Sequence, residues 1–238
     1  MTRRLSAIDV GTNSVRLLVA DVEGEGRDAR ITTVDRQMRI TRLGQGVDAS
    51  RRLDPAAIAR TVGVLEEYRA IIDTLGAERP RATATSAARD SVNRDEFFDP
   101  AEAALGARPE LLPGEEEARL SFLGATVDVT SPGPYLVVDI GGGSTELVFG
   151  TTEPEGLVSL DMGCVRLSEQ FLHGDPPEPE ELSAAIDVAR AHLADAAREI
   201  PAARTARTLI GLAGTVTTVA AVELGLATYD RDRIHHFR

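Results

Sequence analysis

The stretch Val137–Phe149, with the sequence VVDIGGGSTELVF, constrains this chain more than any other. Two apolar runs that suit buried β-strands flank three glycines, which permit a tight connection and close approach of the backbone to a ligand. The N–H groups of such a turn form a nest for an anion, and Asp139 with Glu146 offers hard oxygen ligands to a divalent cation. The pattern predicts a strand, a phosphate-cradling turn and a second strand. The residues of the predicted turn are Gly141, Gly142, Gly143, Ser144 and Thr145.

A second stretch, Asp9–Val19, matches the first at its Asp, its first Gly, its Ser and its apolar continuation. Arg16 stands where the later copy has Glu146, so a phosphate-binding base faces a metal-binding acid. Either copy alone is more typical of a glycine-rich β-hairpin than of a binding site. The paired spacing instead favours two duplicated lobes that close on one polyanion. The predicted phosphate contacts of the earlier copy are Thr12, Asn13, Ser14 and Arg16.

Charge and composition limit the partners. The chain has 238 residues, no Lys and 26 basic residues, so every one of them is Arg and any cationic binding group is a guanidinium, which grips phosphate in a planar, bidentate way. A net charge of −12 argues against nucleic acid and anionic membranes as partners. A polyanionic ligand would have to be held by local Arg, amides and metal ions at short range.

Cys164 is the only cysteine, so no disulfide forms within the chain, as expected of a cytoplasmic protein. The N-terminus leads into the first strand without the core of a signal peptide. The most membrane-like run, 208–227, is interrupted by threonines, glycines and Glu223, so no membrane span is expected. We expect Cys164 to be a small buried side chain rather than a nucleophile.

Strands and helices alternate in both halves, which predicts an α/β fold. Asp54 and Pro55 open a helix that Gly76 ends, and a helix rich in Glu begins after Pro113 and runs to about residue 125. A Pro- and Gly-rich run at 130–134 predicts a boundary between lobes 1–130 and 131–238. Neither a P-loop motif nor a dinucleotide-binding glycine motif is present. A third turn into a helix contributes the last predicted phosphate contacts, Gly214 and Thr215.

Several motifs occur together in one chain: Asp9-x-Gly-Thr-Asn-Ser-x-Arg16, Ala84-Thr-Ser-Ala-x-Arg-Asp90, Gly114-Glu-Glu-Glu-Ala118, Asp139-Ile-Gly-Gly-Gly-Ser-Thr-Glu146, Leu160-Asp-x-Gly-x-Val-Arg166 and Ala213-Gly-Thr215. In combination they resemble the exopolyphosphatase/guanosine pentaphosphate phosphohydrolase family of the actin/Hsp70/sugar-kinase superfamily. The resemblance spans the whole chain.

The resemblance implies two ribonuclease H-like lobes with the active site in the cleft between them. It also implies Mg²⁺-dependent removal of the terminal phosphate from inorganic polyphosphate, or of the 5′-γ-phosphate from pppGpp; Mn²⁺ is an alternative metal. Glu117 matches the family's general base, Asp139 and Glu146 its metal-binding acids, and Arg16 and Arg89 its phosphate-facing arginines. Family members with long-chain activity carry extra C-terminal helical domains, so short chains are expected as substrates. Family members usually continue with more helix after the point where this sequence stops, which could leave the second lobe incompletely covered. For the assembly state, a homodimer is an open alternative.

Structural alternatives stand beside these roles. The three consecutive glutamates suit the start of any helix, and only the resemblance selects Glu117. Arg16 lies in an apolar strand pattern, where an unpaired charge is costly, so a functional role is favoured over a structural salt bridge. Asp9 is equally compatible with a metal site and an Asx cap, and Arg89 with a phosphate contact and an ion pair. His235 and His236 have no further ligands at matching spacing and read as a polar terminus.

Two other functions share the motifs. An ATP-dependent small-molecule kinase of the same superfamily would use similar phosphate loops but needs an adenosine pocket and an acceptor site. A non-catalytic sensor of pppGpp or polyphosphate would bind without turnover.

Overall fold

The computed structural model describes residues 1–26, 29–78 and 80–238. The chain divides into two compact units, Met1–Pro113 and Gly114–Arg238. Within these residues no helix is long and apolar enough to cross a membrane. The α/β fold class predicted from the sequence is confirmed, because each unit is a sheet with packed helices.

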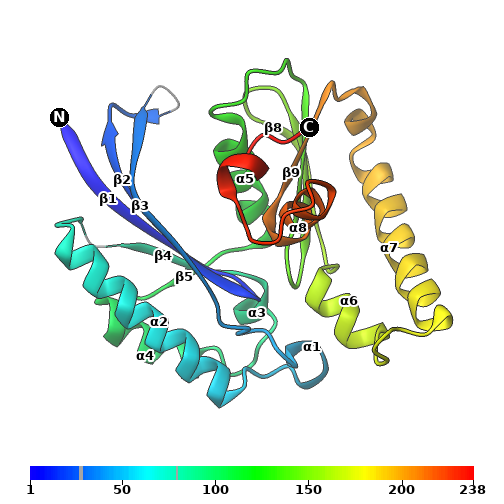
Figure 1. Ribbon diagram of the computed structural model, residues 1–238, viewed down its shortest axis with the longest axis horizontal. Coiled ribbons are helices and arrows are strands. Elements are labelled where there is room, and N and C mark those ends of the chain that lie inside the picture. Colours follow the sequence, from blue (N-terminus) through cyan, green and yellow to red (C-terminus); the bar gives the residue numbers. More distant parts are fainter. Residues whose placement is uncertain (27–28, 79) are drawn as a thin grey trace. The chain divides into compact units, whose positions relative to one another are not determined.

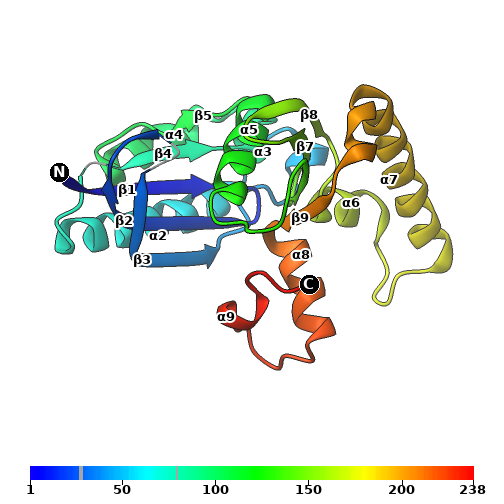
Figure 2. The ribbon, with the colours of Figure 1, turned by 90° about the horizontal axis from the view of Figure 1, so that it is seen from above.

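The first unit is a five-stranded sheet in the order β3-β2-β1-β4-β5 (Figure 2). β1 pairs antiparallel with β2 and parallel with β4. Its strands are β1 (Thr2–Val10), β2 (Ser14–Glu23), β3 (Arg30–Ile40), β4 (Arg81–Ala84) and β5 (Glu110–Leu111). Its helices are α1 (Val47–Ser50), α2 (Pro55–Thr74), α3 (Ser86–Arg89) and α4 (Asp95–Leu105).

Helices α2 and α4 cover one face of this sheet (Figure 1). Leu65 and Tyr68 of α2 are fully buried, and the Tyr68 hydroxyl donates to the Val15 carbonyl oxygen at 3.0 Å. Truncating a side chain such as Leu65 to Ala would cost about 2–5 kcal/mol. The predicted start of α2 is confirmed, because Asp54 accepts from the amides of Ala56 and Ala57.

The second unit repeats this order with β8-β7-β6-β9, in which β6 pairs antiparallel with β7 and parallel with β9. Its strands are β6 (Tyr135–Ile140), β7 (Thr145–Gly150), β8 (Pro154–Leu160) and β9 (Thr208–Leu212). Its helices are α5 (Gly114–Thr126), α6 (Cys164–Phe171), α7 (Pro179–Glu199), η2 (Pro201–Thr205), α8 (Ala213–Glu223) and α9 (Arg231–Ile234). Both sheets therefore place a hairpin beside a parallel strand in the same way.

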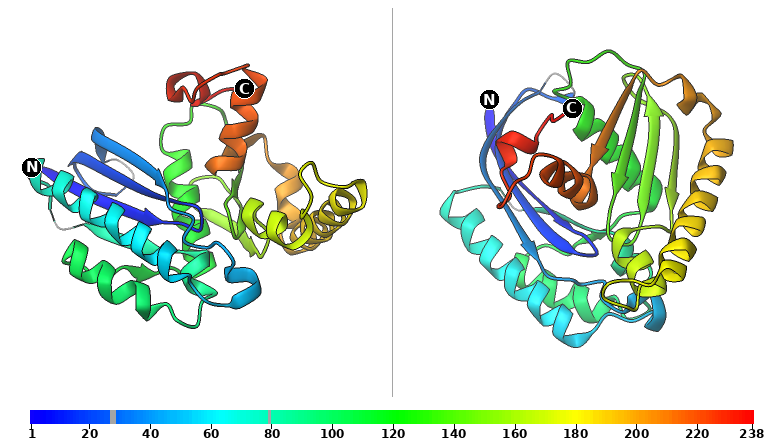
Figure 3. Two further views of the ribbon diagram at one scale, coloured as in Figure 1. Left: turned by 60° about the horizontal axis from the view of Figure 1, so that its bottom comes forward. Right: turned by 45° about the vertical axis from the view of Figure 1, so that its right-hand side comes forward.

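Helices α5 and α7 lie on opposite faces of the second sheet (Figure 3). Val137 and Val148 pack against Phe122 of α5, whereas Leu147 packs on the α7 side with Ala196. This packing places α5 in the second unit. The sequence placed the boundary near residue 130, after this helix, whereas the structure divides the chain at Pro113 and Gly114.

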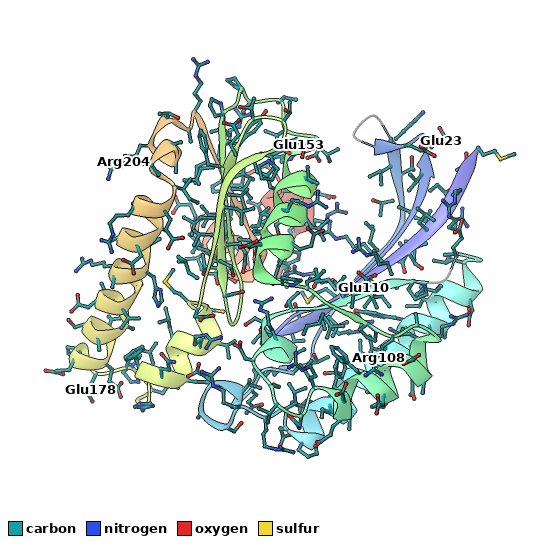
Figure 4. All side chains as sticks on the ribbon, turned by 180° about the vertical axis from the view of Figure 1, so that it is seen from behind. Glu23, Arg108, Glu110, Glu153, Glu178 and Arg204 are labelled. Atoms are coloured by element: carbon teal, nitrogen blue, oxygen red, sulfur yellow. The ribbon has the colours of Figure 1, made fainter. Side chains whose placement is uncertain are left out.

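Helix α7 begins after Glu178, which is labelled in Figure 4. The Glu181 carboxylate accepts the backbone amides of His173, Gly174 and Glu178. These hydrogen bonds, the one from Glu178 first, hold the pKa of the Glu181 carboxyl below its ordinary value. Through these hydrogen bonds, the first turn of α7 holds the Pro-rich segment that precedes the helix.

Candidate active site

The glycine turn between β6 and β7 exposes its amides to a ligand. The Gly141 amide closes the turn on the Ser144 carbonyl oxygen at 3.0 Å. Within the described part of the chain, the amides of Gly142 and Gly143 donate to no protein group. Adjacent N–H groups of this kind form an anion-binding nest. The predicted strand–turn–strand is thus present.

Helix α6 occupies the other side of the same turn. The Cys164 amide donates to the Gly141 carbonyl oxygen at 3.0 Å, and the Val165 amide donates to that of Gly142 at 2.9 Å. Arg166 Nε donates to the Gly143 carbonyl oxygen at 2.8 Å. A Cβ at Gly163 would lie only 2.4 Å from the Gly142 oxygen, so this close approach requires glycine. The turn's carbonyls are therefore engaged by α6.

Asp139 and Glu146 lie directly across from each other on β6 and β7. They share the sheet face of Val137 and Val148, which α5 covers. The Ser121 hydroxyl of α5 donates to Asp139 Oδ2 at 2.8 Å, and the Ser159 hydroxyl of β8 donates to Glu146 Oε1 at 2.8 Å. Two orienting hydroxyls thus hold two neighbouring carboxylates, and neither serine was selected by a sequence motif.

The donors at this position suit a hard divalent cation. Carboxylate oxygens are ligands that suit Mg²⁺, and the two serine hydroxyls orient them. Glu146 is only 2% exposed, and burial of a carboxylate is unfavourable unless hydrogen bonds or a cation compensate it. Asp139 and Glu146 are therefore a chemically suitable pair for the metal that the motifs imply.

The three glutamates at the start of α5 differ in their surroundings. Glu115 is exposed, and Glu116 accepts from Arg119 Nε at 2.8 Å, which raises the pKa of that guanidinium. Glu117 is half-buried and precedes Ser121 by four positions, so both lie on the same face of α5. Of the three glutamates, Glu117 is the one on the helix face that reaches Asp139.

The turn of the first unit has the same construction. The Gly11 amide donates to the Ser14 carbonyl oxygen at 3.0 Å. The Asn13 carbonyl accepts the Thr41 and Arg42 amides, and in the described ranges the amides of Thr12 and Asn13 donate to no protein group. In both turns, carbonyl oxygens accept hydrogen bonds from the protein, whereas two successive amides donate to no described group.

Three hydroxyl residues of the two turns are buried. Thr12 is 9% exposed beneath Gly44, Ser144 is 3% exposed, and the Thr145 hydroxyl donates to the Met162 carbonyl oxygen at 2.5 Å. A phosphate at either turn would therefore meet backbone amides. The Thr145 side chain serves the fold rather than the ligand.

The predicted arginines have protein partners. Arg16 lies across from Asp9, and its Nη1 is 3.5 Å from Asp9 Oδ2, with both side chains more than two-fifths exposed. The sequence favoured a functional role for Arg16 over a structural salt bridge, and the structure shows that this ion pair is present. For Asp9, the sequence left open a metal site and an Asx cap, and the structure adds this ion pair. Arg89 donates from Nη1 to the Leu112 carbonyl oxygen at 2.8 Å.

Arg42 is a candidate that no sequence motif selected. It directly follows Thr41, and both amides donate to the Asn13 carbonyl oxygen, at 3.0 Å for Arg42. Its φ of 52° is uncommon for a residue with a side chain. The guanidinium is exposed and forms no ion pair with the described residues. The Arg42 backbone therefore contacts the first turn, and its exposed side chain is a candidate cation for a phosphate there.

The third predicted contact lies at the start of α8. Gly214 is exposed, and the first amides of any helix lack intrahelical partners. The Thr215 hydroxyl oxygen is buried and has no hydrogen-bond partner among the described residues. A buried hydroxyl without a partner is unusual, and among the described residues Thr41 has the only other one. Gly214 and Thr215 retain the features expected of an anion contact.

Cys164 differs from its expected state. The sequence predicted a small buried side chain, but Cys164 is exposed as the first residue of α6. The prediction was wrong because the Cys164 backbone, rather than its side chain, makes the contact with the glycine turn. Hydropathy does not reveal such an arrangement.

Comparisons with known proteins agree on one family. The family model described as the Ppx/GppA phosphatase family matches residues 18–232. Exopolyphosphatase 2 of Mycobacterium tuberculosis is 50% identical over 238 residues, covering 98% of this chain and 74% of that protein. A guanosine-5′-triphosphate,3′-diphosphate pyrophosphatase of Aeromonas hydrophila is 36% identical, covering 95% of this chain and 45% of that protein. The crystal structure of an exopolyphosphatase-like protein is 43% identical, with a TM-score of 0.89, covering 96% of this chain and 71% of that one.

Proposed function

Because the chain belongs to the Ppx/GppA phosphatase family, we propose that it is a phosphoanhydride hydrolase that removes the terminal phosphate of inorganic polyphosphate. The 5′-phosphate of pppGpp is the second substrate that the relatives support, through the Aeromonas hydrophila protein. The observation that carries the proposal is the pair of facing carboxylates, Asp139 and Glu146, on the two strands that the glycine turn joins, with the Ser121 hydroxyl donating to Asp139. The exposed thiol of the single cysteine fits a reducing cytoplasm.

The amides of Gly142 and Gly143 bind the phosphate oxygens in this proposal. They are fixed before the ligand arrives, because α6 holds the carbonyls of the turn. Preorganised donors of this kind stabilise the charge that develops on the transferred phosphoryl group. Gly214 and Thr215 contribute a further anion contact at the start of α8, where the Thr215 hydroxyl lacks a partner within the described residues. The amides of Thr12 and Asn13, with Arg16, Arg42 and Arg89, bind phosphate in the first unit.

Glu117 acts on the attacking water. Its carboxylate accepts a proton from the water as the water oxygen bonds to the terminal phosphorus. The bridging P–O bond breaks, and the electron pair leaves with the shortened chain. The proton then passes from Glu117 to solvent or product. General-base catalysis of this kind contributes about 10²- to 10⁴-fold to the rate.

Asp139 and Glu146 are the residues that would hold Mg²⁺, or Mn²⁺, with Ser121 and Ser159 orienting one oxygen of each carboxylate. When bound, the ion neutralises negative charge on the phosphate oxygens. Local cations are needed because the net charge of −12 repels an anionic substrate at long range. The Arg side chains and oriented amides act at distances where salt does not screen them.

The test is a comparison of phosphate release from tripolyphosphate, long polyphosphate, pppGpp and ATP in the presence of Mg²⁺. The proposal expects turnover of a polyphosphate, of pppGpp, or of both, well above that of ATP. Phosphoryl transfer from ATP to sugars or acids, without phosphate release from the other substrates, would identify a kinase of the superfamily instead. Binding without turnover would identify a sensor.

A further inference from the structure

A group of metal-binding side chains lies in the second unit, apart from the proposed active site. Asp128, just beyond the end of α5, meets His235 and His236, which directly follow α9. His235 Nε2 lies 3.6 Å from Asp128 Oδ2, and His236 Nε2 lies 3.6 Å from Asp128 Oδ1. One ligand atom from each residue lies within 4.8 Å of the other two. The sequence found no third ligand for the histidines because Asp128 is remote along the chain.

The backbone around the two histidines brings their rings to the same side. Successive side chains of an extended segment point in opposite directions. Here His236 has a φ of 60°, which is uncommon outside glycine, and the two imidazoles stack with their centroids 3.9 Å apart. The turn in the chain at His236 is what lets both rings reach one carboxylate.

Contacts on both sides hold this arrangement in place. Ile234, the last residue of α9, is 7% exposed, and the His235 amide donates to the Arg231 carbonyl oxygen at 2.8 Å. Beyond the histidines, Arg238 Nη2 donates to the Ser131 hydroxyl at 3.2 Å, in the segment that follows Asp128. The segment after α9 thus contacts the segment after α5 at two places, at Asp128 and at Ser131.

We propose that Asp128, His235 and His236 bind a divalent transition-metal ion of the Zn²⁺ class. Two imidazole nitrogens and one carboxylate oxygen form a common ligand set for Zn²⁺, and water completes the tetrahedron. Bond lengths of about 2.0–2.2 Å at tetrahedral angles separate neighbouring ligand atoms by about 3.3–3.6 Å. His235 Nε2 lies 3.6 Å from Asp128 Oδ2, which agrees with this spacing, and His236 Nε2 lies 3.6 Å from the other carboxylate oxygen, Oδ1. One ligand nitrogen of each ring lies within 4.8 Å of the other.

This site is distinct from the carboxylate pair of the proposed active site. Glu117 lies in the first turn of α5, and Asp128 lies beyond its last, roughly 15 Å away along the helix axis. The ligand chemistry also differs, because imidazole favours Zn²⁺, Ni²⁺ or Cu²⁺ over Mg²⁺. A bound ion would fasten the segment after α9 to the end of α5. The inference is independent of the catalytic proposal.

The experiment is a Zn²⁺ titration of the chain, purified without a histidine tag and stripped with EDTA, by calorimetry in excess Mg²⁺. The variants are His235→Ala, His236→Ala and Asp128→Asn. The matched control is His173→Ala, which removes another exposed imidazole of the same unit. Circular dichroism and thermal unfolding of each variant verify that it is folded. Co²⁺ absorption spectra report whether the bound ion is tetrahedral.

We expect one Zn²⁺ per wild-type chain, at least about tenfold weaker binding in each of the three variants, and no change in the control. A tetrahedral Co²⁺ spectrum should be lost in the same three variants. Absence of stoichiometric Zn²⁺ binding to the wild type, or equal affinity in folded His236→Ala, would overturn the proposal. In that case the two histidines only pair electrostatically with Asp128.

Discussion

Ser121 of helix α5 donates its hydroxyl to Asp139 of strand β6 across 2.8 Å. This hydrogen bond joins the helix that begins with Glu117 to the strand that carries the proposed metal ligand. It orients one carboxylate oxygen of Asp139, and it also restrains the rotation of α5 about its axis over the sheet. The proposed general base and the proposed metal site are therefore oriented by the same contact.

Replacing Ser121 by Ala tests this coupling. We expect the concentration of Mg²⁺ needed for half-maximal phosphate release to rise about tenfold, because loss of an orienting partner costs about 10- to 100-fold in metal affinity or activity. Ser183→Ala on the exposed surface of α7 is the control. An unchanged Mg²⁺ dependence in Ser121→Ala would show that the contact is only structural.

Glu117→Gln preserves size but removes the proton acceptor. We expect kcat for phosphate release to fall by about 10²- to 10⁴-fold while polyphosphate binding is retained. Glu116→Gln is the matched control, since the Glu116 carboxylate pairs with Arg119 on the helix surface. Wild-type turnover in Glu117→Gln would remove this residue from the mechanism.

Removal of divalent cations tests the role of Asp139 and Glu146. We expect EDTA to stop phosphate release and added Mg²⁺ or Mn²⁺ to restore it. Asp139→Asn should not recover at any Mg²⁺ concentration that supports the wild type, because the neutral amide lacks the negative charge that the carboxylate offers to the cation. Full turnover of the wild type in EDTA would refute the metal assignment.

Arg42 is tested by its effect on substrate affinity. We expect Arg42→Ala to raise KM about tenfold with a smaller change in kcat, because one charge-assisted contact to a phosphate is lost. Arg51→Ala is a close control, since Arg51 is also exposed and has a φ of 54°. Equal KM values in the two variants would assign Arg42 no part in binding.

Two glycine-to-alanine substitutions compare a closely packed glycine, Gly163, with one that has open space around it, Gly124. A Cβ at Gly163 would lie 2.4 Å from the Gly142 oxygen, whereas one at Gly124 in α5 would meet nothing within 4 Å. We expect Gly163→Ala to lower the free energy of unfolding by about 1–3 kcal/mol. Gly124→Ala should raise it by up to about 1 kcal/mol, because Ala favours a helix. Denaturant unfolding measures both, and a stable Gly163→Ala variant would show that α6 can move away from the turn.

The sequence predicted those features that depend on local chemistry. The glycine turns at Gly11 and Gly141 follow from residue spacing, and the start of α2 follows from Asp54 and Pro55, because turns and caps are set by neighbouring residues. The α/β class follows from the alternation of strands and helices.

Features that depend on tertiary packing were not predictable. Ser121 and Ser159 carry no motif, and only the packing of α5 and β8 brings them to the two carboxylates. The unit boundary fell at Pro113 rather than near residue 130, because α5 packs on the sheet that follows it. Asp128 and the histidines meet only in the folded chain.

The hydrogen bonds from α6 to the glycine turn bear on how the product is released. The Gly142 carbonyl oxygen accepts the Val165 amide, and this hydrogen bond does not involve the ligand. The Gly142–Gly143 peptide should therefore keep its orientation when the ligand leaves. In the proposed function, this turn would bind the tetrahedral oxyanion itself and not the chain behind it. Orthophosphate, the released product, should therefore compete with fresh substrate and inhibit turnover as it accumulates.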